Sequence, residues 1–115
     1  VIAGATDDAD IPVDTKGRVS PQTGGMSVNA AWRTLPYWRV PRRLRHLLPE
    51  ATGSNLLFCW RMGEGAFESA TLSPVLNLSV DRAPHGLVEP CRTMALRAFE
   101  DALAATRTLW KVDEE

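Results

Sequence analysis

The segment KGRVSPQTGGMSV, residues 16–28, holds more glycine, proline and serine than any stretch of the same length elsewhere in the chain, and the fold is organised around it. Gly17 permits a tight turn, and Pro21 fixes one backbone angle shortly before Thr23. The Gly24-Gly25 pair permits positive φ values and lets a ligand or another strand approach the bare backbone. The segment is therefore either a well-made turn or one wall of a binding site, and turns are the commoner of the two.

Length and composition indicate one globular domain. The chain has 115 residues, enough for a single compact core but not for two. Its longest apolar run, residues 56–60, ends at Arg61 and is too short to span a membrane. No basic-then-apolar signal peptide is present, so we expect no membrane partner.

The two cysteines, Cys59 and Cys91, have no CxxC or histidine-spaced neighbours, which argues against a zinc site. Cys59 lies in an apolar run, where a small buried thiol is the simpler interpretation. We expect two reduced cysteines and a cytoplasmic site of action.

Charge is segregated along the chain. Residues 1–15 carry four aspartates and no basic residue, whereas residues 16–49 carry seven basic residues and no acidic one. A basic middle steers anionic partners such as a dinucleotide, a nucleic acid or an acidic protein. Alternatively, the acidic head folds over the basic middle and neutralises it, and the sequence does not decide between the two.

Small, acidic and non-periodic residues predict a flexible N-terminal segment over residues 1–15. Residues 16–112 predict a single α+β domain with a small mixed or antiparallel sheet. Its expected strands are residues 26–28, a buried strand at 56–62, and a hairpin of 74–81 with 85–89. Apolar residues at three- and four-residue steps predict one long amphipathic helix from Cys91 to Lys111.

Between the first strand and residue 49 the chain is aromatic and basic. Trp32 and Trp38 are expected to anchor the segment to the core, with an aromatic platform for a flat ligand as the alternative. Residues 39–48 predict a short basic amphipathic helix with leucines on one face. Lys and Arg are too sparse elsewhere for a chain-long nucleic-acid groove, so nucleic acid is an unexpected partner.

Few residues of the sequence are candidates for a catalytic role. His46 is expected at the surface, and His85 begins a predicted strand, where a lone histidine is more often a structural hydrogen bonder than a catalyst. The carboxylates that could act as acid or base are Glu64, Glu68 and Glu89. The sequence contains no P-loop, catalytic triad order or paired metal ligands.

Two blocks resemble a known family. The first is KGRVSPQTGGMSV itself, and the second is a strand opened by His85 and ended by Pro90, then Met94, Phe99 and Trp110-Lys111. Together they resemble the NAD-dependent cytotoxic effectors of type VI secretion, whose domain is ADP-ribosyltransferase-like. The resemblance covers roughly residues 16–111 in order.

The resemblance implies an ADP-ribosyltransferase-like fold around a cleft for NAD. It implies NAD contacts from Arg18, Thr23, Gly24, Gly25 and Ser27, with Arg18 or the basic segment meeting the pyrophosphate. Across the cleft it implies His85, and it makes His85, Ser27 and Glu89 the candidate catalytic residues.

The implied reaction breaks the nicotinamide–ribose bond and transfers ADP-ribose to a macromolecule or to water, in the cytosol of a target cell. It also implies an immunity protein as a partner. An NAD-contacting arginine expected ahead of the loop is missing from residues 1–15, and the chain opens on Val1. Two explanations stay open, a lost N-terminal portion and a degenerate relative that no longer turns over NAD.

Two other hypotheses remain beside the enzyme. In one, the chain is a non-catalytic binding module that holds an acidic protein or nucleic acid through the basic segment Arg39–Arg45. In the other, it is a structural domain whose Gly-Gly loop is only a hairpin turn.

Overall fold

The computed structural model describes residues 3–4, 11–63 and 69–113. It is a mixed α/β fold with mostly antiparallel sheets and one α-helix, which confirms the predicted class in its coarse form. The strands are β1 (Ala3–Gly4), β2 (Ile11–Pro12), β3 (Arg18–Val19), β4 (Met26–Asn29), β5 (Cys59–Met62), β6 (Ala70–Ser73), β7 (Leu76–Arg82), β8 (His85–Pro90), β9 (Met94–Ala95) and β10 (Trp110–Asp113). The helices are α1 (Leu96–Ala105) and the 3₁₀ turns η1 (Trp32–Thr34), η2 (Arg42–Leu44) and η3 (Arg107–Leu109).

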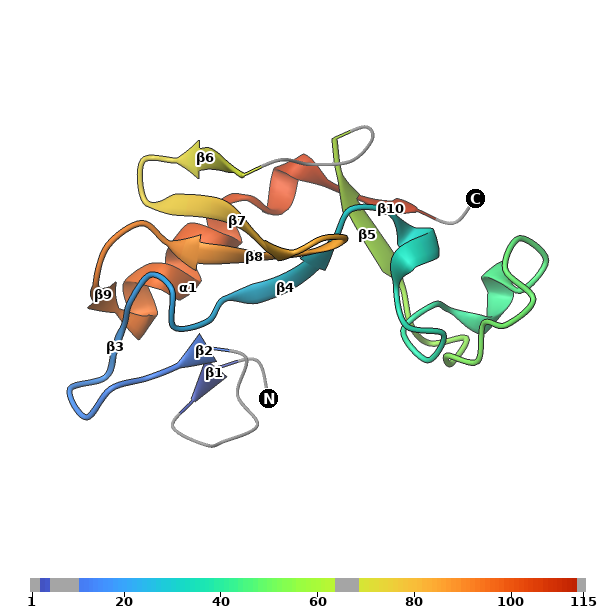
Figure 1. Ribbon diagram of the computed structural model, residues 1–115, viewed down its shortest axis with the longest axis horizontal. Coiled ribbons are helices and arrows are strands. Elements are labelled where there is room, and N and C mark those ends of the chain that lie inside the picture. The colour runs from blue at the N-terminus through green and yellow to red at the C-terminus, as the bar shows by residue number, and fades with distance from the viewer. Residues whose placement is uncertain (1–2, 5–10, 64–68, 114–115) are drawn as a thin grey trace.

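The largest sheet is antiparallel and has the order β4-β8-β7-β6 (Figure 1). The predicted hairpin is confirmed as β7–β8, with Leu78 opposite Val88. β4 extends the sheet on the other side of β8, where Met26 lies opposite Val88. The loop of residues 20–25 therefore runs directly into the edge strand of this sheet.

One face of the sheet is apolar and packs on α1. Leu76, Leu78 and Val88 alternate along β7 and β8 and form a buried cluster with Phe99 of α1, which is 0% exposed. Ile11 belongs to the same cluster at 2% exposure, although the sequence assigns residues 1–15 to a flexible segment. Residues 1–2 and 5–10 of that acidic segment lie outside the described part of the chain.

The predicted helix over residues 91–111 is shorter in the structure. Residues 94–95 form β9 and pair with β3, and the backbone N–H of Leu96 donates to the carbonyl of Gly17 at 3.0 Å. At the other end, the chain leaves the helix at Thr106, and Trp110–Asp113 pairs with β5. The two flanks are thus held by strand pairing rather than by helical hydrogen bonds. No helix in the described ranges is long and apolar enough to cross a membrane.

Residues 30–58 form a second lobe with a small core of its own, and β5 and β10 lie between the two lobes (Figure 1). Leu44 is buried at 1% exposure, but the helix predicted over residues 39–48 reduces to η2 and the turns after it. Trp32 packs partly on this core, as predicted, whereas Trp38 is 66% exposed and does not anchor the segment.

The sequence predicts a buried strand over residues 56–62, and the prediction that this strand is buried is wrong. β5 covers only Cys59–Met62, and it pairs with β10 alone in a two-stranded ribbon. Cys59 is buried, as expected, while Phe58 is 54% exposed and Trp60 is 57% exposed. Neither Cys59 nor Cys91 is in a disulfide, in agreement with the reduced cysteines that the sequence predicts.

Candidate functional site

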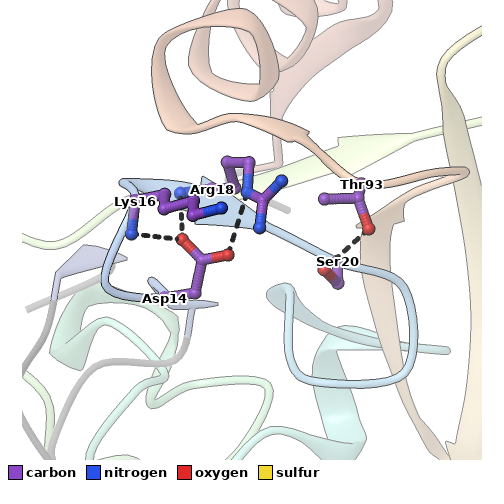
Figure 2. Close-up of polar contacts among 5 residues, drawn as sticks. All are labelled: Asp14, Lys16, Arg18, Ser20 and Thr93. Carbon is purple, nitrogen blue, oxygen red and sulfur yellow. Dashed lines mark hydrogen bonds and ion pairs between the residues drawn. The ribbon is translucent and has the colours of Figure 1, made fainter.

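A tight turn at Asp14–Arg18 brings the first strands to the start of the loop (Figure 2). Oδ1 of Asp14 accepts hydrogen bonds from the backbone N–H groups of Lys16 at 2.9 Å and Arg18 at 2.8 Å. Oδ2 accepts a third from Nε of Arg18 at 3.0 Å. Gly17 has a φ of +72°, which the turn requires and glycine permits without strain.

These contacts set the electrostatics of Asp14. The backbone N–H of Arg18 is the main cause that holds the pKa of Asp14 below its ordinary value, and the Lys16 N–H and the Arg18 side chain act in the same direction. The carboxylate is therefore ionised at neutral pH and fixes the Nε side of the Arg18 guanidinium. In the described part of the chain, no other group is bonded to the Nη atoms of Arg18.

The middle of the loop covers Glu89, near the end of β8. The backbone N–H of Gln22 donates to Oε2 of Glu89 at 2.9 Å. Gln22 has a φ of +64°, a conformation that is uncommon outside glycine, and Glu89 is only 7% exposed. Thr23 closes the turn, because its hydroxyl donates to the carbonyl of Ser20 at 2.7 Å. The loop thus holds a nearly buried carboxylate through a single backbone N–H.

Gly25 is needed for packing against the sheet. A Cβ at this position would lie 2.4 Å from the carbonyl oxygen of Val88 and 3.3 Å from Cα of Glu89. The neighbour that comes close to the bare backbone of Gly25 is therefore strand β8 and not a ligand. Gly24 has a φ of +144° and is half-buried beside it.

Arg18 and Thr23, both predicted to contact NAD, line one open depression of about 190 Å³, together with four further residues: Pro12, Val13, Asp14 and Ser20. Ser20 is fixed by a 2.9 Å hydrogen bond between its hydroxyl and that of Thr93, as Figure 2 shows. Pockets for whole ligands are usually about 300–1,000 Å³, so this one is too small for a dinucleotide. A guanidinium and hydroxyls suit one anionic portion of it, such as the pyrophosphate.

Ser27 and His85 lie away from this depression. Ser27 is exposed on β4 opposite Leu87, and His85 lies opposite Asn29 at the far end of β8. Four positions along β8 separate His85 from Glu89, a distance of about 13 Å. The expectation that His85 faces the Gly-Gly loop across a cleft is therefore corrected, because the loop meets β8 at Glu89.

His85 has a different partner. Its Nδ1 lies 2.7 Å from Oδ1 of Asp81 across the β7–β8 turn. This hydrogen bond is the main cause that lowers the pKa of Asp81. The contact fits the simpler interpretation of His85 as a structural hydrogen bonder.

Strand alternation nevertheless places Ser27, His85 and Glu89 on one face of the sheet, opposite the face that packs on α1. Sequence reasoning missed Asp14 and Gln22 as loop-fixing residues. An aspartate four positions before an arginine, with a glycine between them, was the available signal for Asp14. For Gln22 no signal exists in the sequence.

Other candidates contribute no site. Glu64 and Glu68 lie outside the described residues. Within the described ranges, no group of three or more His, Cys, Asp or Glu side chains is arranged to hold a metal ion. His46 is exposed, as predicted, and its Nδ1 lies 3.1 Å from the carbonyl of Arg43.

Comparison of the chain with protein-family models, curated proteins and solved structures found no match.

Proposed function

We propose that this chain is an NAD-dependent cytotoxin with an ADP-ribosyltransferase-like domain, which cleaves the nicotinamide–ribose bond and transfers ADP-ribose to a macromolecule or to water. The observation that carries the proposal is the 2.9 Å hydrogen bond between the Gln22 N–H and Glu89. It joins the segment of the family resemblance to a carboxylate that was already a catalytic candidate. Arg18 and Thr23 line a depression formed by the same loop.

In this proposal Arg18 and Thr23 bind the pyrophosphate of NAD. The Asp14 contact leaves the Nη edge of Arg18 to donate two parallel hydrogen bonds to phosphate oxygens. The Ser20 hydroxyl can donate to a phosphate oxygen when it accepts from Thr93, whereas the Thr23 hydroxyl does so only by releasing the carbonyl of Ser20. The ribose and nicotinamide extend beyond the depression, across the loop towards Glu89.

Glu89 supplies the electrostatic contribution to bond cleavage. When the nicotinamide–ribose bond breaks, its electron pair leaves with the nicotinamide nitrogen, and positive charge develops on the ribose. A carboxylate held by the Gln22 N–H in a nearly buried position stabilises that charge without having to reorganise. The acceptor oxygen or nitrogen then bonds to the ribose carbon and gives up its proton.

Because about 13 Å of strand separates His85 from Glu89, the proposal assigns bond cleavage to Glu89 alone. It retains Ser27, on the same sheet face as Glu89, as a contact for the substrate beyond the loop. An acceptor in the target-cell cytosol and an immunity protein that covers the loop complete the proposal.

The test is nicotinamide release from NAD by the purified chain. Glu89→Gln keeps an oxygen that can accept from Gln22 but removes the negative charge, and we expect the rate to fall by about 10²- to 10³-fold. Glu100→Gln, on the exposed side of α1, is the matched control and should keep the wild-type rate. Equal rates for Glu89→Gln and wild type, or no release by wild type, would contradict the proposal.

A further inference from the structure

The two-stranded ribbon β5–β10 carries a row of apolar side chains of which three are largely exposed and two, Met62 and Trp110, are half-buried. Trp60 and Val112 lie directly opposite one another, and Met62 lies opposite Trp110. Opposed residues of antiparallel strands share a face. Phe58 directly precedes β5 in the chain. Phe58, Trp60 and Val112 are 54%, 57% and 40% exposed. These five residues define the ribbon face.

The ribbon β5–β10 adjoins the lobe of residues 30–58 (Figure 1), and this part of the sequence is basic. Residues 30–63 contain six arginines and one glutamate, a formal charge of +5 in a chain whose net charge is −1. Arg43 connects the two features, because its guanidinium stacks over the Phe58 ring at 4.4 Å and donates to the carbonyl oxygen of Asn55 at 2.9 Å. Arg42 and Arg45, on either side of it, are exposed.

Three exposed arginines of this segment, Arg39, Arg42 and Arg45, form no ion pair within the described part of the chain. Asp14, the described aspartate of the acidic head, pairs instead with Arg18 at the other end of the molecule. Neutralisation of the basic middle therefore has to come from outside these residues.

The arrangement favours a protein over a lipid surface or a nucleic acid. Arg33 stacks on Trp32 at 4.5 Å and Arg43 is held by Phe58 and backbone carbonyls, so both are oriented towards their own chain. Arg61 donates to the carbonyl of Gly63 at 3.4 Å, so it is also oriented towards its own chain. The three remaining arginines, Arg39, Arg42 and Arg45, are fewer than the clusters that hold anionic lipids or track a phosphate backbone. Exposed Trp and Phe side chains next to a segment rich in arginine have the composition of a protein interface.

We propose that the ribbon face, together with Arg39, Arg42 and Arg45 of the adjoining basic segment, docks an acidic protein surface. Apolar side chains of the partner pack on Phe58, Trp60 and Val112, and its carboxylates pair with the arginines. This surface is separate from the loop depression and does not depend on the proposed NAD chemistry.

The test uses two fluorescent peptides in which Leu and Phe alternate with Glu, or with Lys in the control peptide. We expect the full chain to bind the Glu peptide and not the Lys peptide, with an affinity that falls as salt is raised. Phe58→Ser with Trp60→Ser should weaken binding by about 30-fold or more, as loss of central aromatic anchors does. Leu109→Ser is the matched control, because Leu109 is also 54% exposed but lies outside the ribbon face.

Charge variants complete the design. Arg42→Glu with Arg45→Glu should abolish binding of the Glu peptide, whereas Arg92→Glu with Arg107→Glu, exposed elsewhere, should not. Unchanged melting temperatures verify that each variant is folded. Failure to bind the Glu peptide, or binding that the ribbon variants leave intact, overturns the proposal. So does a stronger response to phosphatidylserine vesicles, to single-stranded oligothymidine, or to a second copy of the chain, if the same ribbon variants remove it.

Discussion

At the scale of single residues, Asp14 controls how the chain enters the loop. Its carboxylate accepts two backbone N–H groups and the Nε of Arg18, and these bonds lower its pKa in the folded state. A carboxyl group whose pKa is lowered by folding contributes stability that is complete above its unfolded-state pKa. That contribution disappears as the pH falls through the folded-state pKa.

We therefore predict that Asp14→Asn lowers the melting temperature at pH 7, and that the difference from wild type shrinks as the pH is lowered below the ordinary aspartate pKa. The measurement is thermal unfolding of both proteins as a function of pH. A difference that stays constant into acid would show that the charge of Asp14 contributes nothing.

A second residue-scale prediction concerns Gly25. Its missing side chain lets the loop cross the Val88 carbonyl, and Gly25→Ala would put Cβ 2.4 Å from that oxygen. We expect a loss of about 1–3 kcal/mol in the free energy of unfolding, as in other overpacked sites. Gly17→Asn is the control, because nothing lies within 4 Å of a Cβ there and asparagine tolerates its φ of +72°. Urea unfolding of both variants checks the prediction, and equal losses would contradict it.

Some features of the loop of residues 16–28 can be predicted from the sequence, and others cannot. The tight turn at Gly17 and the need for a bare backbone at Gly25 follow from residue type alone. What approaches Gly25 does not, because a ligand and a strand impose the same demand for glycine. The pairing of Gln22 with Glu89, rather than of the loop with His85, depends on strand register, which the sequence of the loop does not specify.

At the scale of elements, Phe99 is the residue through which α1 packs on the sheet. It is 0% exposed in the main core, whereas Trp110, beyond the helix, is half-buried and donates through Nε1 to the Thr106 hydroxyl at 3.1 Å. We predict that Phe99→Ala lowers the free energy of unfolding by about 3–5 kcal/mol. Trp110→Ala should cost clearly less. Denaturant unfolding measures both, and the reverse order would contradict the assigned core.

The β7–β8 hairpin was predictable because its alternation of apolar and polar residues has only one simple solution. The ends of α1 were not, because the apolar stripe continues through Met94 and Trp110 into segments that pair as strands. Periodicity reports which residues face the core and not which hydrogen bonds the backbone makes. The prediction of a buried strand from the apolar run at residues 56–60 failed for a related reason, since a solvent-facing apolar strand has the same composition as a buried one.

At the scale of the whole molecule, the loop site and the basic end are separate (Figure 1). Arg18, Thr23 and Glu89 belong to the lobe built on the main sheet, whereas Arg42 and Arg45 belong to the lobe of residues 30–58. We predict that Arg42→Glu with Arg45→Glu leaves nicotinamide release from NAD within about twofold of wild type, since pairwise effects at well-separated sites are small. A large loss in that assay would mean that the basic lobe, and not the loop, holds the pyrophosphate.

The central claim is that the loop binds NAD, and calorimetric titration of the folded chain with NAD tests it most directly. The account predicts saturable heat with the wild-type chain, and its loss in Thr23→Val with Arg18→Gln, while the Arg92→Gln control binds normally. A folded wild-type chain that gives no saturable heat, or a double variant that binds as tightly as wild type, would contradict it.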